Sequence, residues 1–177
     1  MIKTLGLPDV LLIESRVFAD ERGWFRELWN AARAAGLPAF VQDNIAFSRR
    51  RVLRGLHFQQ PHAQGKLVTL VSGEVYDVAV DIRPGSASFG RHTAVTLSAE
   101  SGAAIYIPPG FAHGYQVISD SAHVAYKVTD YYHPESQHTI AWNDPELAID
   151  WPLGDPILSA NDRAAPKLSE LRAMLHA

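Results

Sequence analysis

Residues 66–83 read KLVTLVSGEVYDVAVDIR and hold two apolar runs on either side of Gly73. The runs cover residues 66–72 and 74–83, and both are rich in valine. Each run predicts a β-strand, because β-branched residues favour extended backbone and glycine marks the turn between them. The sequence therefore indicates two consecutive strands at the centre of the chain.

The second run alternates in character along its length. Tyr76, Val78, Val80 and Ile82 point to one face, whereas Asp77 and Asp81 fall on the opposite face. Successive side chains of a strand point to opposite faces, so this pattern is typical of a half-buried strand with its carboxylates toward solvent.

Similar short runs continue outward, separated by turn residues such as glycine and proline. Further strands are predicted at residues 93–97, 104–107, 114–118, 123–128 and 139–143. Helix is predicted only at residues 27–35 and 164–175. We therefore expect a mainly β fold, an antiparallel β-barrel with a few short helices at its N- and C-terminal margins.

Length and composition narrow the classes of protein. The 177 residues fit one domain, 1–177, and a hydrophobic fraction of 47% supports a sizeable core. A net charge of −3 argues against a nucleic-acid partner, and the absence of cysteine excludes thiolate catalysis and disulfides. Neither a signal peptide nor a membrane-spanning run is evident, so we expect a cytoplasmic protein with no membrane partner.

The segment LRGLHFQQPHAQGK, residues 53–66, concentrates residues that could carry chemistry. Arg54 suits phosphate binding, His57 suits proton transfer near neutral pH, and Lys66 suits stabilisation of an oxyanion. Unpaired charges are costly inside a packed core. We therefore expect these side chains to share one strand that faces a cavity.

Three further segments offer candidates with simpler alternatives. His113 follows a Pro-Pro-Gly turn and could instead bond its own loop, while Tyr126 could be an ordinary strand residue. Tyr132 could pack or stack on a base, and Asp162 could orient a histidine or favour a helix N-terminus.

The eight histidines do not form a tight metal-binding pair. There is no His-x-His and no His-Glu-x-x-His motif, and the pairs His57/His62 and His133/His138 are each five residues apart. We expect no catalytic metal.

Motifs in a fixed order resemble those of the dTDP-4-dehydrorhamnose 3,5-epimerase family, over about residues 9–170. They are DERGWFRE at 20–27, QDN at 42–44, LRGLHFQ at 53–59, GEVYDVAVDIR at 73–83, PGFAHG at 109–114 and YKVTDY at 126–131. The resemblance implies a cupin (jelly-roll) barrel, a homodimer, no cofactor and a dTDP-linked 4-keto-6-deoxyhexose substrate. It also implies a place in deoxysugar biosynthesis.

The same resemblance implies roles for individual residues. His57 matches the catalytic base, Asp162 the carboxylate that orients it, Tyr126 the acid on the opposite face, and Lys66 the group beside the enolate oxygen. Matches to substrate contacts are Arg22, Glu27, Gln42, Asn44, Arg54, His113 and Tyr132. The chain departs from the family at Asn161, where a basic residue is usual, and at Gln137, where glutamate is common.

The expected reaction is epimerisation at C3 and C5 of dTDP-4-dehydro-6-deoxyglucose. A proton α to the C4 ketone is removed from one face and returned from the other. Two alternatives stay open: a mono-epimerase or ketoisomerase acting on a related nucleotide sugar, and a noncatalytic sugar-binding cupin.

Overall fold

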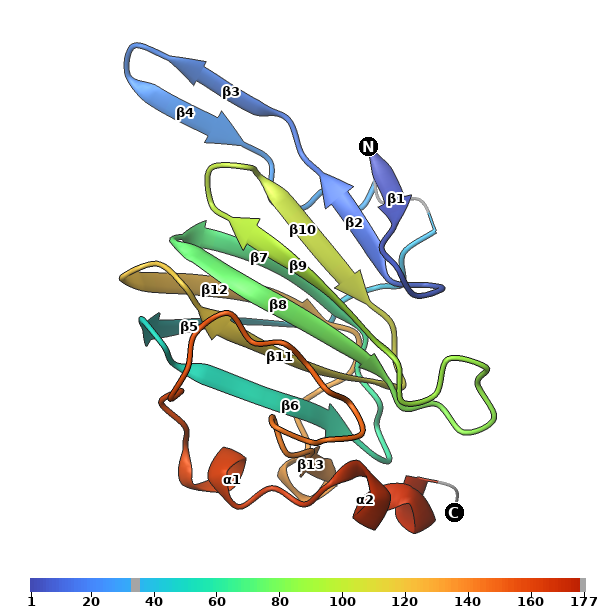
Figure 1. Cartoon of the computed structure of the whole chain (residues 1–177). Helices are drawn as coiled ribbons and strands as arrows, with labels where there is room; N and C mark the ends of the chain where they lie inside the picture. Colours follow the sequence, from blue (N-terminus) through green and yellow to red (C-terminus); the bar gives the residue numbers. More distant parts are fainter. Residues whose placement is uncertain (33–35, 176–177) are drawn as a thin grey trace.

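The computed structural model describes residues 1–32 and 36–175, and it is built from two facing β-sheets (Figure 1). The larger sheet has the order β1-β2-β10-β7-β12-β5, and the smaller has the order β13-β6-β11-β8-β9. All paired strands of the described residues are antiparallel, which confirms the predicted mainly β, jelly-roll class of fold.

The elements have the following bounds. The strands are β1 (Ile2–Thr4), β2 (Leu11–Glu14), β3 (Val17–Asp20), β4 (Gly23–Arg26), β5 (Gln42–Arg49), β6 (Leu53–Gln59), β7 (Lys66–Ser72), β8 (Glu74–Asp81), β9 (His92–Ser98), β10 (Ala103–Ile107), β11 (Phe111–Val117), β12 (Ser121–Val128) and β13 (Gln137–Thr139). The helices are the 3₁₀ turn η1 (Pro134–Ser136), α1 (Ala160–Arg163) and α2 (Leu168–Leu175).

The two central strands exist as predicted but do not pair with each other. β7 pairs with β10 and β12 in the larger sheet, whereas β8 pairs with β11 and β9 in the smaller one. The chain crosses between the sheets at Gly73, which has a φ of 78°. A Cβ at Gly73 would lie 2.1 Å from the Ser121 carbonyl oxygen, so only glycine fits this crossing.

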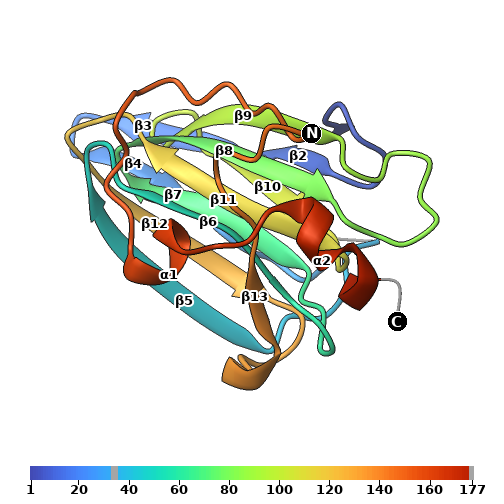
Figure 2. The same ribbon diagram turned by 60° about the horizontal axis from the view of Figure 1, so that its bottom comes forward.

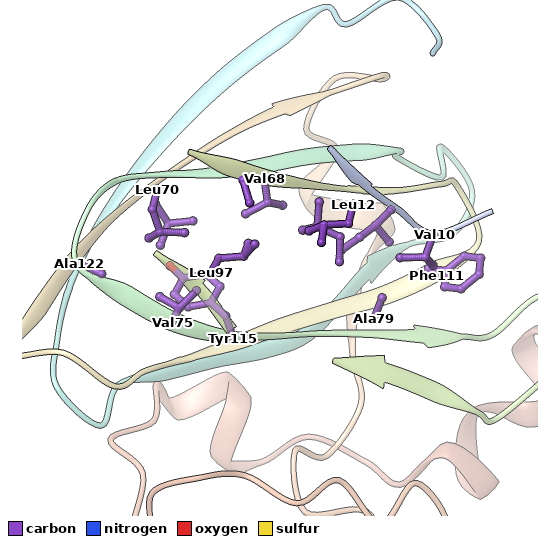
Figure 3. Close-up of a cluster of buried hydrophobic side chains, with 14 of the residues drawn as sticks. Val10, Leu12, Val68, Leu70, Val75, Ala79, Leu97, Phe111, Tyr115 and Ala122 are labelled. Atoms are coloured by element: carbon purple, nitrogen blue, oxygen red, sulfur yellow. The ribbon is translucent and has the colours of Figure 1, made fainter. Parts of the chain in front are cut away.

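An apolar core fills part of the space between the sheets (Figure 3). Val68 and Leu70 of β7 meet Val75 of β8 and Leu97 of β9, and all four are fully buried. Phe111 and Tyr115 of β11 extend the same cluster. The core gives the barrel a rigid interior against which functional side chains can be positioned.

The prediction that β8 is half-buried is wrong. Val78 and Val80 pack outside the smaller sheet beneath the C-terminal segment, while Asp77 and Asp81 point into the barrel and are 0% exposed. Asp81 bonds Arg83 and two serines, and Asp77 bonds a histidine described below. The alternation reflects two buried environments, one apolar and one polar.

The C-terminal segment covers the outer face of the smaller sheet (Figure 2), where Leu168 and Leu175 join a second apolar cluster. The predicted helix 164–175 begins only at Leu168, and α1 was not predicted. The strand predicted at 139–143 is instead Gln137–Thr139, so only Thr139 is shared.

The N-terminal prediction of a helix at 27–35 is wrong for residues 27–32, which have no helical structure, and the rest lies outside the described residues. Trp29 and Phe40 instead pack with Leu67 and Tyr106 over the outer face of the larger sheet. No helix within residues 1–32 and 36–175 is long and apolar enough to cross a membrane.

The β3–β4 hairpin projects beyond the barrel (Figure 1). At its base the buried Arg26 donates hydrogen bonds to the carbonyl oxygens of Leu70 and, at 2.9 Å, of Ala99. Trp24 and Phe25, near its tip, are exposed. The hairpin is thus fixed at one end and presents apolar side chains at the other.

Candidate active site

Strand β6 carries Arg54 and His57 on one face because of a β-bulge. Residues three apart in a regular strand point to opposite faces. Here His57 pairs with His113 of β11, and Arg54 pairs with Tyr115. The paired residues are therefore three positions apart on β6 but only two positions apart on β11. The extra residue returns both side chains to the face of β6 that is directed toward the larger sheet, where Arg54 stays exposed and His57 is half-buried.

The bulge requires Gly55, whose φ is 133°. A Cβ on this residue would lie 2.5 Å from the Gly114 Cα and 2.9 Å from the His113 carbonyl oxygen. The two backbones can therefore approach only because both strands carry glycine at this point.

His57 forms a dyad with Asp162 of α1, which lies against β6. Nε2 of His57 is 2.5 Å from Oδ1 of Asp162, and the hydroxyl of Ser159 donates to Oδ2 at 2.8 Å. Burial alone would raise the pKa of Asp162, but hydrogen bonds from His57 and Ser159 outweigh it and hold that pKa below its usual value. The ionised carboxylate accepts the Nε2 hydrogen and leaves Nδ1 of His57 free to accept a proton.

Lys66 approaches this dyad from the other sheet. It lies at the start of β7, and its Nζ donates to the His57 carbonyl oxygen at 3.1 Å. The expectation that Arg54, His57 and Lys66 share one strand is therefore wrong, because residues 60–65 cross between the sheets and Lys66 faces β6 from the opposite side. Burial lowers the pKa of Lys66 to about 8, and the charge of Asp77 opposes this fall.

Tyr126 of β12 faces the barrel interior from the same sheet as Lys66. The space between the two sheets that is bordered by His57, Lys66 and Tyr126 is the cleft. It packs against the apolar cluster between the sheets and pairs through its backbone with Val68 and Asn44. Burial raises the pKa of Tyr126, although the nearby Arg54 guanidinium lowers it in part. The phenol is thus protonated at neutral pH and can donate a proton. His57 and Tyr126 come from facing sheets.

Several predicted binding residues line the open edge between β5 and β6. Arg54 donates to the Ser48 hydroxyl at 2.9 Å and thereby links the two strands. Gln42 donates to the Asn44 side chain at 2.9 Å and accepts from the backbone N–H of Tyr132 at 3.1 Å. The structure brings this predicted group together.

His113 is brought to the interior and is nearly fully buried. Its Nε2 lies 3.0 Å from Oδ2 and 3.1 Å from Oδ1 of Asp77. Asp77 was missed as a site residue because its strand was interpreted as half-exposed. The signal was present in the sequence, since two carboxylates alternate with alanine and valine in a run that is otherwise apolar.

Tyr115 is a second residue that sequence reasoning missed. Only 4% of it is exposed. Burial raises the pKa of Tyr115 to about 12, while the Arg54 charge and a hydrogen bond with the Ser48 side chain oppose the rise. Tyr115 therefore belongs to the same group of polar side chains as Arg54 and Ser48.

Two predicted binding residues do not reach the cleft of their own chain. Arg22 lies at the tip of the exposed hairpin and bonds Asp20. Glu27 accepts a hydrogen bond from Asn30 at 2.9 Å, beside a hollow of about 470 Å³ over the larger sheet.

A second hollow of about 390 Å³ opens beside α1, next to the cleft. Tyr132 lines it together with Gln137 and Asn161, the two positions where the chain departs from the family pattern.

In the described part of the chain, the side chains placed to share a metal ion are His62, Asp130 and His133, outside the cleft. The absence of a catalytic metal stays a prediction.

The barrel and its polar cleft place the chain in the class of cupin-type isomerases. A family model described as dTDP-4-dehydrorhamnose 3,5-epimerase matches residues 4–170. A Pseudomonas aeruginosa relative of that name is 54% identical over 90% of this chain and 91% of its own, and an Escherichia coli relative of that name is 52% identical over 93% and 92%.

Solved structures agree with this class. An epimerase from Legionella pneumophila in complex with dTDP-4-keto-L-rhamnose has a TM-score of 0.95 at 49% identity, over 99% of this chain and 96% of that one. A Streptomyces bikiniensis 3'-monoepimerase in complex with dTDP-quinovose has a TM-score of 0.90 at 32% identity, over 97% and 90%. The chain belongs to the dTDP-4-dehydrorhamnose 3,5-epimerase family, and it is an isomerase.

Substituting Gly55 with alanine tests the bulge. We expect Gly55→Ala to lower the free energy of unfolding by at least ~2 kcal/mol, because the new Cβ overlaps the β11 backbone. Chemical denaturation measures this loss. Gly154→Ala is the matched control, since nothing lies within 4 Å of a Cβ there. Equal stability of the two variants would contradict the packing argument.

The Asp77 charge should set the alkaline limit of activity. The Lys66 ammonium is lost as the pH rises through about 8. In Asp77→Asn the carboxylate that opposes the burial effect is gone, so the alkaline limb of kcat/KM should move to lower pH by roughly one unit. The measurement is a pH–rate profile, with Glu74→Gln on the same strand as control. An unmoved limb in Asp77→Asn would separate Lys66 from the reaction.

Proposed function

We propose that the chain converts dTDP-4-dehydro-6-deoxyglucose into dTDP-4-dehydrorhamnose by inverting C3 and C5. The observation that carries this proposal is the placement of His57 and Tyr126 on facing sheets, with the Lys66 ammonium bonded to the His57 carbonyl oxygen. A ketose ring bound in the cleft would meet a base on one face and an acid on the other.

Proton removal falls to His57. Hydrogens on C3 and C5 are acidified by the C4 ketone, because the carbanion formed is an enolate. Nδ1 of His57 takes the proton, and the Asp162 carboxylate stabilises the imidazolium. The Lys66 ammonium, in a site with little water, stabilises the enolate oxygen. A contact of this kind is worth roughly 3–4 kcal/mol in the transition state.

Reprotonation falls to Tyr126. The phenol gives its proton to the carbon from the face opposite His57, so the configuration inverts. The tyrosinate that remains lies near the Arg54 charge, which favours the anion. Each carbon thus loses one proton and gains one, with both side chains restored through solvent.

The nucleotide half binds beside the cleft in this proposal. Arg54 lies at the mouth between β5 and β6, where its guanidinium suits the diphosphate. The hollow lined by Tyr132, Gln137 and Asn161 would take the thymine. Asn161 and Gln137 differ in charge from the residues usual in the family. The affinity for the nucleotide therefore depends more on stacking of the base against Tyr132 in this chain.

The proposed enzyme acts as a homodimer. The hairpin that carries Arg22 is anchored by Arg26 and extends beyond the barrel of its own chain (Figure 1). Its exposed Trp24 and Phe25, and the exposed Ile45 and Phe47 on the outer face of β5, are apolar surfaces that a second copy would cover. In this arrangement the hairpin brings Arg22 to the partner's cleft.

We also propose that the whole chain acts as one domain in the cytoplasm, where nucleotide sugars are made. Support comes from α1, which supplies Asp162 to the dyad, and from a net charge of −3, which suits neither a nucleic acid nor an anionic membrane.

Solvent exchange tests the reaction. Incubation with dTDP-4-dehydro-6-deoxyglucose in D₂O should label both C3 and C5, as read by NMR. His57→Ala should abolish labelling, because no base remains. Tyr126→Phe should lower inversion more than exchange, since the base still removes and returns protons on one face.

Each failure has a distinct meaning. Label at one carbon would indicate a mono-epimerase, and movement of the ketone to C3 would indicate a ketoisomerase. No label with tight binding would indicate a noncatalytic cupin. Full exchange in His57→Ala would remove that residue from the mechanism.

Mixing two inactive variants tests the shared site. Arg22→Ala and His57→Ala chains are each expected to be nearly inactive alone. After subunit exchange, activity should rise to about a quarter of wild type, because half of the dimers are mixed and each has one complete site. If Arg22 serves its own chain, mixing restores nothing.

A further inference from the structure

A cluster of metal-ligating side chains lies outside the cleft. His62 comes from the loop between β6 and β7, whereas Asp130 and His133 come from the loop that follows β12. One ligand atom from each lies within 4.8 Å of the others. Nδ1 of His62 is 3.5 Å from Oδ2 of Asp130, and the two imidazole rings stack with their centres 4.0 Å apart.

Two glutamine side chains hold the backbone of this cluster in place. Gln59 donates to the His62 carbonyl oxygen at 2.7 Å and accepts from the His133 N–H at 2.9 Å. Gln64 donates to the Asp130 carbonyl oxygen at 2.8 Å. These hydrogen bonds use backbone atoms of the three ligating residues. Oδ1 of Asp130 accepts from the N–H of Tyr131 at 2.8 Å, and Oδ2 faces His62.

We propose that His62, Asp130 and His133 form a binding site for Zn²⁺, separate from the catalytic residues. Two imidazoles and one carboxylate are a donor set that zinc accepts, and exposure of the site leaves the fourth position to water. Magnesium and calcium prefer oxygen ligands, and the site has no thiolate to select softer metals.

Coordination requires a modest rearrangement. The ring planes differ by 16°, so the nitrogen lone pairs lie in nearly parallel, stacked planes and one ring must turn toward the ion. The side chain of His62 is 46% exposed and that of His133 is 31% exposed, which gives each ring room to change rotamer. Glu135, 3.5 Å from Nδ1 of His133, adds negative charge beside the ion.

Bound zinc would tie the two loops together. Tyr132 lies between Asp130 and His133 and bonds Gln42 of the larger sheet, while His133 bonds Gln59 of the smaller one. The segment therefore already bridges both sheets, and a metal ion would restrict it further.

Calorimetric titration of the untagged full chain with zinc chloride tests the site. We expect one equivalent to bind and to raise the melting temperature. His62→Asn and His133→Gln should each weaken binding by at least about tenfold, because each removes a ligand. Asparagine suits the φ of 65° at His62, so the fold should persist. Co²⁺ should give an absorption spectrum typical of tetrahedral coordination.

His92→Gln is the matched control, since His92 lies on β9 at the opposite edge of the smaller sheet. It should bind zinc as the wild type does. Absence of zinc binding, unchanged binding in both His62→Asn and His133→Gln, or an equal loss in His92→Gln would each overturn the proposal. None of these outcomes depends on the epimerase reaction.

Discussion

The contact of Gly55 with Gly114 is the constraint on which the cleft depends. Where these two backbones meet, β6 has one more residue than β11. The side chains of β6 on either side of this point therefore change the face of the sheet to which they are directed. Without that extra residue, Arg54 and His57 would lie on opposite sides of the sheet. The proposed diphosphate contact and the proposed base would then have no common cavity.

The interior of the barrel is divided into an apolar part and a polar part. Leucine and valine side chains fill much of the space between the sheets, while Lys66, Asp77 and His113 are buried beside them. Charges in such surroundings interact more strongly than they would in water. The low pKa of Lys66 follows directly, because burial disfavours its ammonium and the Asp77 charge offsets this effect only in part.

Local chemistry was readable from the sequence, whereas relations between strands were not. Composition and turn spacing predicted the strands between residues 66 and 128 and the mainly β class, but not the strands before them. The type of each side chain suggested His57, Lys66 and Tyr126. A strand pattern does not say which sheet a strand joins, so Arg54 and His57 were wrongly expected to share a strand with Lys66. The burial of Asp77 arises from the second sheet, which no local pattern reveals. Resemblance, rather than periodicity, linked Asp162 to His57 across 105 positions.

The loops at the open end of the barrel are held by side chains rather than by strands. The side chains of Gln42, Gln59 and Gln64 bond the backbone of residues 130–133. These loops can therefore change in sequence without altering the strand-to-strand hydrogen bonds that position His57 and Tyr126. His57, Tyr115 and Tyr126, by contrast, belong to strands β6, β11 and β12 of the barrel wall. Preference among sugars is therefore expected to depend on the barrel wall, and preference among nucleotides on the loops.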